Sequence, residues 1–184
     1  MHKVKLYVDL GANRGLTVKQ FLIDHPETDR VYAWEPTPRL AKDLRHEFRY
    51  NPRVHVIEAC AGTSEEDVEF YTGLRSDQSS TVLRGKQGKY GADYTHPLKV
   101  RQLDFLRWWD QHVHPEDSVW VKVDIEGAEY PVLSHWVSGG LPSGNLRELR
   151  VEWHAHKFEG ITRELHDEVQ GKLRTLGITW TDWK

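Results

Sequence analysis

The stretch VKLYVDLGANRG, residues 4–15, decides the fold class of this chain. Its first seven residues are apolar and β-favouring over a short length, which is typical of a buried strand. Gly11 and Gly15 then interrupt the strand, and apolar residues at helical spacing follow between positions 18 and 22. The stretch therefore predicts a strand, a tight glycine turn and a helix, which together begin a parallel strand–helix–strand unit.

Further units of the same kind follow along the chain. Residues 30–35 and 54–60 are predicted strands, and helical segments lie between the strands. Three such units within the first sixty residues predict an α/β fold with a doubly wound, mostly parallel sheet. Later strands are expected at residues 118–124, 149–154 and 178–183. The sheet is therefore expected to be shortened at the C-terminus, near its sixth strand.

A long polar stretch, residues 73–97, interrupts this pattern. Short strands predicted at residues 68–71 and 99–101 flank it, which indicates an inserted β-hairpin-like segment. A stretch of this length is uncommon as an inert connection in a compact domain. We hypothesise that it is a mobile substrate lid, the alternative being a loop without a role. Its basic and aromatic residues are Arg75, Arg84, Lys86, Lys89, Tyr90 and Tyr94.

The composition describes one globular domain over residues 1–184. Hydrophobic residues make up 38% and charged residues 29%, and no apolar run has the ~18 residues that a spanning helix needs. The N-terminus leads directly into the first strand, which leaves no room for a signal peptide. Cys60 is the single cysteine, which excludes an internal disulfide framework and favours a cytoplasmic location. The net charge of −3 does not suggest binding to nucleic acid.

The glycine turn carries the first functional signal. The spacing of Gly11 and Gly15 fits neither a dinucleotide fingerprint nor a phosphate-binding P-loop, which argues against an NAD-linked oxidoreductase. Asp9, at the end of the first strand, suits a cationic ligand such as an ammonium or a sulfonium. Glu35 ends the second strand, where an acid can accept hydrogen bonds from both ribose hydroxyls. Together these residues favour a nucleoside cofactor over the alternative of a tight turn and a solvated strand end.

Several motifs resemble one known family. In chain order they are VDLGANRG at 8–15, WEP at 34–36, RQLD at 101–104, VKVDIEGAE at 121–129 and EWH at 152–154. This set resembles the FkbM-type S-adenosylmethionine-dependent methyltransferases. The resemblance implies a Rossmann-like, class I methyltransferase fold. It also implies methyl transfer to a hydroxyl oxygen of a small molecule or glycan, with S-adenosylmethionine as the cofactor.

The resemblance also implies a cofactor site that the glycine turn opens. In this site the turn wraps the amino-acid part of the cofactor, Glu35 binds the ribose, and the residues around Ala61 border the adenine. Ser80 belongs to a loop over the cofactor, the alternative being an ordinary polar loop. The implied site residues are Asp9, Gly11, Asn13, Gly15, Glu35, Pro36, Ala61, Ser80 and Asp124.

Methyl transfer is an in-line displacement that needs the acceptor oxygen positioned and its proton removed. Acids and bases for this task are expected at the carboxyl ends of the central strands. Asp124 is the first candidate for a positioning or base residue. His154 is the alternative base, because its unperturbed pKa lies near neutrality. Glu126 is a third candidate; the alternative is that Glu126 and Glu129 are structural and tie down the turn before the helix. This oxygen- and nitrogen-rich cluster could also hold a divalent metal, but nothing in the spacing requires one, and none is assigned.

A second function class remains open at this point. The shortened C-terminus suggests a catalytically silent, cofactor-binding partner subunit as the alternative to an active enzyme. Trp180 and Trp183 crowd the C-terminus, where they would cover a sheet edge or form a homodimer contact. Trp108 and Trp109 are adjacent, so we expect one to face the core and the other a pocket or an interface.

Overall fold

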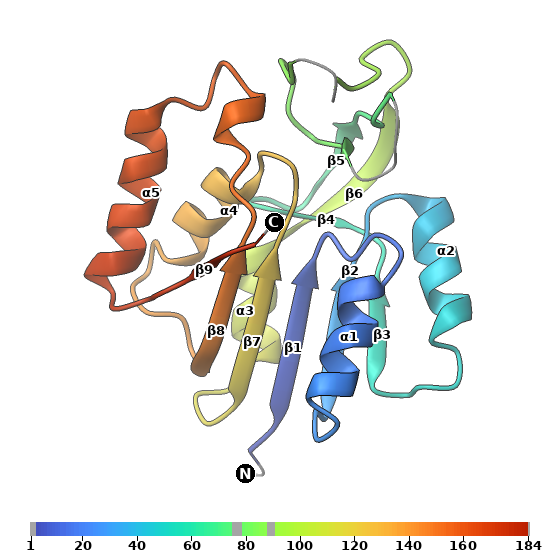
Figure 1. Ribbon diagram of the computed structural model, residues 1–184, viewed down its shortest axis with the longest axis vertical. Helices are drawn as coiled ribbons and strands as arrows, with labels where there is room; N and C mark the ends of the chain where they lie inside the picture. Colours follow the sequence, from blue (N-terminus) through green and yellow to red (C-terminus); the bar gives the residue numbers. More distant parts are fainter. Residues whose placement is uncertain (1–2, 75–78, 88–90, 184) are drawn as a thin grey trace.

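The structure is a computed structural model of the chain, and it describes residues 3–74, 79–87 and 91–183. It has an α/β fold in which a six-stranded sheet lies between helices (Figure 1). The strand order is β3-β2-β1-β7-β8-β9, and every neighbouring pair is parallel, which confirms the predicted Rossmann-like sheet. The strands are β1 (Lys5–Leu10), β2 (Arg30–Trp34), β3 (Val54–Ile57), β7 (Ser118–Val123), β8 (Asn145–Val151) and β9 (Thr181–Asp182).

Alternation along β1 divides the core into two layers, because successive side chains of a strand point to opposite faces. Leu6, Val8 and Leu10 join the larger cluster, in which α3, α4 and α5 pack, whereas Tyr7 joins the smaller cluster with α1 and α2. Figure 1 shows α1 in front of the sheet and α3 behind it. The helices are α1 (Leu16–Asp24), α2 (Pro38–Glu47), α3 (Phe105–His112), α4 (Glu129–Trp136) and α5 (Arg163–Thr175).

The strand order reverses between β1 and β7. From β1 the chain continues to β2 and β3 on one side, and from β7 it continues to β8 and β9 on the other. Leu10 is in register with Val123, so Gly11 and Asp124 leave the sheet side by side. Ligands of open α/β sheets bind outside the carboxyl ends of the strands at such a reversal.

A second, three-stranded sheet stands beyond the carboxyl ends of the central strands (Figure 1). It contains β4 (Cys60–Gly62), β5 (Glu66–Phe70) and β6 (Leu98–Asp104). The antiparallel β5–β6 pair is the expected hairpin-like segment. The single strand predicted at residues 54–60 is wrong, because the chain leaves the central sheet after Ile57 and Cys60 pairs with Gln102 of β6. Apolar residues suit either sheet, so the sequence did not locate this break.

The expectation for Trp108 and Trp109 is also wrong, because both side chains are buried in the same core. Trp108 packs edge-on against Trp34, with 5.2 Å between the ring centres, and Trp109 packs against Trp136 at 4.7 Å. Helix α3 is covered by the sheet on one side and by α4 on the other, so two adjacent positions of the helix can face apolar neighbours. The indole nitrogen of Trp109 donates a hydrogen bond to the carbonyl oxygen of Ser143.

The C-terminal residues extend the central sheet. β9 pairs in parallel with β8, and Trp183 follows it beneath the guanidinium group of Arg150. Trp180 packs against Trp153 at a ring-centre distance of 6.0 Å. Trp180 and Trp183 thus lie at the edge of the sheet, beside β8 and β9, which is one of the two alternatives expected for them. The homodimer contact stays a prediction.

Candidate functional site

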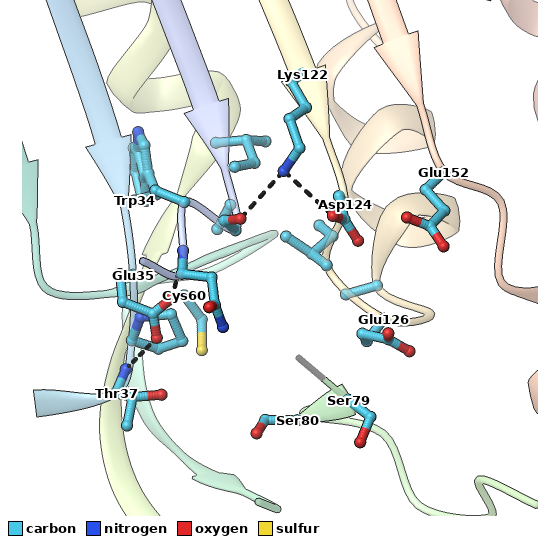
Figure 2. A pocket seen from close by; sticks show the side chains of 18 of the residues that line it. Trp34, Glu35, Thr37, Cys60, Ser79, Ser80, Lys122, Asp124, Glu126 and Glu152 are labelled. Carbon is cyan, nitrogen blue, oxygen red and sulfur yellow. Dashed lines mark hydrogen bonds and ion pairs between the residues drawn. The ribbon is translucent and has the colours of Figure 1, made fainter. Parts of the chain in front are cut away.

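A cavity of about 630 Å³ opens at the strand-order reversal. Its size falls in the range of cofactor sites, ~300–1,000 Å³. Figure 2 shows Glu35, Thr37 and Cys60 on one wall, Asp124, Glu126 and Glu152 on the other, and Ser79 and Ser80 at the lower edge. The predicted site residues among its lining are Gly11, Asn13, Glu35, Pro36, Ala61, Ser80, Asp124 and Glu126.

The glycine turn is shaped by close contact with the β7 end. Gly11 has a φ of +86°, and an added Cβ would lie 2.0 Å from the carbonyl oxygen of Asp124. The amides of Gly11 and Ala12 donate to the carbonyl oxygen of Trp34, which fixes the turn to β2. Asn13 also has a left-handed backbone, with a φ of 48°. A backbone that is fixed and carries no side chain at Gly11 allows a ligand to approach the turn closely.

Gly15 lies where α1 packs against α2. It does not line the cavity; it precedes α1 with a φ of +74°. An added Cβ would lie 2.7 Å from Leu44 Cδ2 and 2.8 Å from Phe48 Cε2. The absence of a side chain at Gly15 therefore lets α1 pack against α2, and its contact with a cofactor stays a prediction.

The expectation that Asp9 faces a cationic ligand also needs correction. Its carboxylate is fully buried behind the cavity lining, where it lies 3.1 Å from Lys122 Nζ and accepts a hydrogen bond from Thr17. Lys122 is buried too, and its Nζ also lies 3.2 Å from Asp124 Oδ2 (Figure 2). The cation that Asp9 pairs with thus belongs to the protein. Burial alone would lower the pKa of Lys122, but the charges of Asp9 and Asp124 raise it more.

Sequence reasoning missed Lys122, although a signal was present. A lysine within the otherwise apolar run of residues 118–123 must find a partner when its strand is buried. Residues two apart point to the same side of a strand, so Asp124 was a partner that the sequence could have indicated. The second partner, Asp9, comes from the neighbouring strand β1, and this pairing of strands was not known from the sequence.

Glu35 is the best-placed acid for a ribose. Its side chain lines the cavity, although the residue is only 4% exposed. One carboxylate oxygen accepts from the backbone amide of Asn13 at 3.0 Å, and the other accepts from the amide of Thr37 at 2.8 Å. These bonds fix the carboxylate and leave further lone pairs for hydroxyl donors. Burial raises the pKa of Glu35, and the two backbone bonds oppose this rise.

The opposite wall gathers the acidic residues that follow β7 and β8. β8 ends at Val151, earlier than the strand predicted at residues 149–154, so Glu152 and His154 lie beyond the strand. They still converge with Asp124: His154 Nε2 lies 3.1 Å from Glu152 Oε1 and 3.9 Å from Asp124 Oδ1. Asp124 lines the cavity, and burial raises the pKa of its carboxyl, against the opposing charge of Lys122.

The surroundings of His154 differ from those that the role of a general base assumes. The residue is fully buried behind the cavity lining, and its Nδ1 lies 2.8 Å from Glu129 Oε1. Burial lowers the pKa of His154, but the hydrogen bond with Glu129 and the nearby carboxylates of Glu152 and Glu126 raise it more, to about 10. The pKa near neutrality on which this expectation rested does not hold for the buried side chain, and the base role of His154 stays a prediction.

Glu126 connects the inserted segment to the cavity wall. Its carboxylate lies 2.6 Å from Lys86 Nζ and 2.9 Å from Lys157 Nζ, and its carbonyl oxygen accepts a hydrogen bond from Thr81. Lys86 is buried, which lowers its pKa in spite of Glu126. The described part of the insertion is thus held to the wall by a buried ion pair. The lid residues Arg75, Lys89 and Tyr90 lie outside the described residues.

Glu129 ties down the turn before α4. Its two carboxylate oxygens accept hydrogen bonds from the amides of Ile125 and Gly127, each at 2.9 Å. The sequence alternative of a structural role in this turn therefore agrees with its geometry. Cys60 lies on the opposite wall, where burial raises the pKa of its thiol to about 12, as expected for an unreactive cysteine.

Across the described part of the chain, no helix combines the length and apolar character needed to span a membrane. No curated protein matches the chain. A crystal structure of the methyltransferase FkbM from Methylobacillus flagellatus KT has a similar fold, with a TM-score of 0.55 and 17% sequence identity. The similar region covers 93% of this chain and 37% of that protein. The family model for the methyltransferase FkbM domain matches residues 9–177. The chain therefore belongs to the FkbM methyltransferase domain family.

Proposed function

We propose that the chain is an S-adenosylmethionine-dependent methyltransferase that acts on a hydroxyl oxygen of a small molecule or glycan. The observation that carries this proposal is Glu35, a buried carboxylate at the end of β2 that faces the same cavity as the glycine turn. This acid and this turn are the two elements that a nucleoside cofactor needs at a strand-order reversal. Membership of the FkbM methyltransferase family supports methyl transfer as the reaction.

The residues present fit such a cofactor. The cavity, at about 630 Å³, has room for a nucleoside with an amino-acid side arm. Glu35 would accept hydrogen bonds from the ribose hydroxyls, and the turn from Gly11 to Asn13 would surround the amino-acid part. Ala61 would border the adenine, and Ser80 would contact the cofactor from the inserted segment. Bound S-adenosylmethionine would supply a methyl group activated by a positively charged sulfur.

The chain's own chemical task is then to orient the acceptor. Asp124 lines the cavity at the end of β7, and its side chain is 25% exposed. Its carboxylate would accept a hydrogen bond from the acceptor hydroxyl and take up the proton as the new carbon–oxygen bond forms and the carbon–sulfur bond breaks. Holding oxygen and methyl carbon in line is the larger part of such catalysis.

Calorimetry with S-adenosylmethionine and S-adenosylhomocysteine tests the cofactor assignment. We expect binding of both, weakened in Glu35→Gln by roughly 10- to 100-fold, because a hydrogen bond to a charged group contributes about 1.5–3 kcal/mol. Glu148→Gln is the control, since Glu148 lies on β8 and pairs with Arg150 outside the cavity. Absence of binding at millimolar cofactor would refute the proposal.

The silent-subunit alternative is separated by turnover. Methyl transfer by the purified chain to any hydroxyl acceptor, measured with a labelled methyl group, eliminates it. Cofactor binding with no transfer until a second protein is added would favour it instead. Removal of residues 73–97 tests the substrate-lid hypothesis in the same assay, and unchanged turnover on the true acceptor would reject that hypothesis.

A further inference from the structure

The imidazole of His154 has one ring nitrogen that is bound and one that is not. Nδ1 lies 2.8 Å from Glu129 Oε1. Nε2 is buried as well, yet nothing in residues 3–74, 79–87 and 91–183 gives it a hydrogen bond. Nε2 lies 3.1 Å from Glu152 Oε1, which is short enough for a hydrogen bond. The angle of this contact therefore excludes the hydrogen bond. Buried polar atoms of native proteins nearly always have a partner, so Nε2 points to a group that would complete this site.

We propose that Asp124, Glu152 and His154 bind a divalent cation. One ligand atom from each residue lies within 4.8 Å of the other two. Atoms that bind a common ion at ~2.0–2.2 Å lie at most about 4.4 Å apart, so small side-chain movements bring all three to one ion. The observed separations from His154 Nε2, 3.1 Å to Glu152 Oε1 and 3.9 Å to Asp124 Oδ1, already satisfy this limit.

Glu129 prepares the histidine for this role. Metal-binding histidines generally donate their other ring N–H to a carboxylate or carbonyl oxygen, which fixes the tautomer and the ring orientation. Glu129 Oε1 is that acceptor for His154 Nδ1. Glu129 is itself held by the backbone amides of Ile125 and Gly127. The neutral form of His154 would thus carry its proton on Nδ1 and direct the Nε2 lone pair toward Asp124 and Glu152.

The charged groups around the cluster carry more negative than positive charge. Its ion-pair network joins carboxylates to lysines and reaches from the insertion to β1. Among residues 3–74, 79–87 and 91–183, five carboxylates face three lysines there, so two negative charges remain when His154 is neutral. The carboxylates are Asp9, Asp124, Glu126, Glu129 and Glu152, and the lysines are Lys86, Lys122 and Lys157. A divalent cation would balance both remaining negative charges, whereas a second proton on the imidazole would balance only one of them.

The proposed ion would face the cofactor cavity. Asp124 and Glu152 both line that cavity, and Figure 2 shows their carboxylates on the same wall. His154 reaches the ion from behind this wall, where it is fully buried. The remaining coordination positions would therefore open into the cavity, to water or to a ligand oxygen. Binding of the ion does not depend on methyl transfer.

The ligand set indicates which ion to use. Two carboxylates favour Mg²⁺ and Mn²⁺, and an imidazole favours transition metals. Mn²⁺ satisfies both preferences. It is also directly observable, because the paramagnetic resonance signal of free Mn²⁺ weakens when the ion is bound. We therefore expect the metal-free chain, prepared with a chelator, to bind one Mn²⁺.

Matched glutamate variants test the site. Glu152→Gln removes a proposed ligand. Glu148→Gln is its control: Glu148 lies within β8, four residues earlier, and the two side chains are 30% and 29% exposed. We expect Mn²⁺ binding to weaken at least about 10-fold in Glu152→Gln and Asp124→Asn, and to stay unchanged in Glu148→Gln. The ion should also raise the unfolding temperature of the wild type more than that of Glu152→Gln.

Two outcomes overturn the proposal. One is an unchanged Mn²⁺ signal with the wild-type chain at millimolar protein, which would mean that the site holds protons alone. The other is equal binding by the wild type and Glu152→Gln, or an equal loss in Glu148→Gln, which would place the ion elsewhere. Circular dichroism of each variant establishes that it is folded, and Asp124→Asn supplies a second test if Glu152→Gln does not fold.

Discussion

Replacement of Gly11 by alanine should destabilise the chain more than replacement of any glycine that merely has a left-handed backbone. The Gly11 φ is +86°, and an added Cβ would lie 2.0 Å from the Asp124 carbonyl oxygen. Gly177, which follows α5, provides the comparison. Its φ is +73°, and a Cβ there would meet no atom within 4 Å in the described part of the chain. The two substitutions therefore share the backbone penalty and differ in the contact.

The expected magnitudes follow from these two contributions. A left-handed alanine costs about 1–2 kcal/mol relative to its usual conformation, and both variants incur this. Only Gly11→Ala also forces atoms into a backbone group that cannot rotate away, which adds about 1–3 kcal/mol. The free energy of unfolding should thus fall by about 1–2 kcal/mol in Gly177→Ala. In Gly11→Ala it should fall by about 2–5 kcal/mol, with the unfolding temperature lower by about 2–4 °C per kcal/mol.

Urea denaturation followed by circular dichroism measures both losses. Calorimetry with S-adenosylhomocysteine adds a functional readout, because the turn must move away from Asp124 to accommodate the methyl group. Gly177→Ala should bind as the wild type does, and Gly11→Ala should bind more weakly. Equal losses of stability in the two variants, together with equal affinity, would refute the contact between the β1 turn and the β7 end.

Three further predictions concern buried ionisable groups. Burial raises the pKa of Glu35, so cofactor affinity should fall as the pH decreases, starting above the pH range in which an exposed glutamate titrates, because the protonated acid loses its acceptor role; an equally steep profile in Glu35→Gln would contradict this. Lys122→Met leaves the Asp9 carboxylate buried and unpaired, so urea denaturation should show a loss of about 3–5 kcal/mol. Adding Asp9→Asn should recover part of that loss, and strictly additive losses would reject the pairing. Burial raises the pKa of Cys60 to about 12, so iodoacetamide at about pH 8 should modify the native chain far more slowly than the urea-unfolded chain; similar rates would contradict its burial.

Much of the fold was predictable from local pattern. Residues 4–24 predict β1, the turn and α1 because each has a distinct signal: a short apolar run, glycines and helical spacing. The break between β3 and β4 was not predictable. Residues 54–60 are uniformly suited to a strand, and only the pairing of Cys60 with Gln102, far along the chain, draws them into a second sheet.

The candidate site shows the same division. Glu35 was identified because its position after β2 follows from local sequence, and the structure places it in the cavity. The contacts of Asp9 and Gly15 were not predictable because each involves a distant partner, Lys122 for the first and Phe48 for the second. A charge or a glycine does not reveal in sequence what will lie against it.

The amino-acid sequence determined the parallel α/β order of elements, the glycine turn and the acids at the strand ends, because these depend on neighbours within a few residues. Only the tertiary structure decided what those acids face. Pairing of β1 with β7 brings Lys122 to Asp9, and the close ends of β7 and β8 bring Asp124 and Glu152 to the unpaired nitrogen of His154. The reason is physical: burial and the distance to opposite charges set the state of an ionisable group, and both come from residues far apart in the chain.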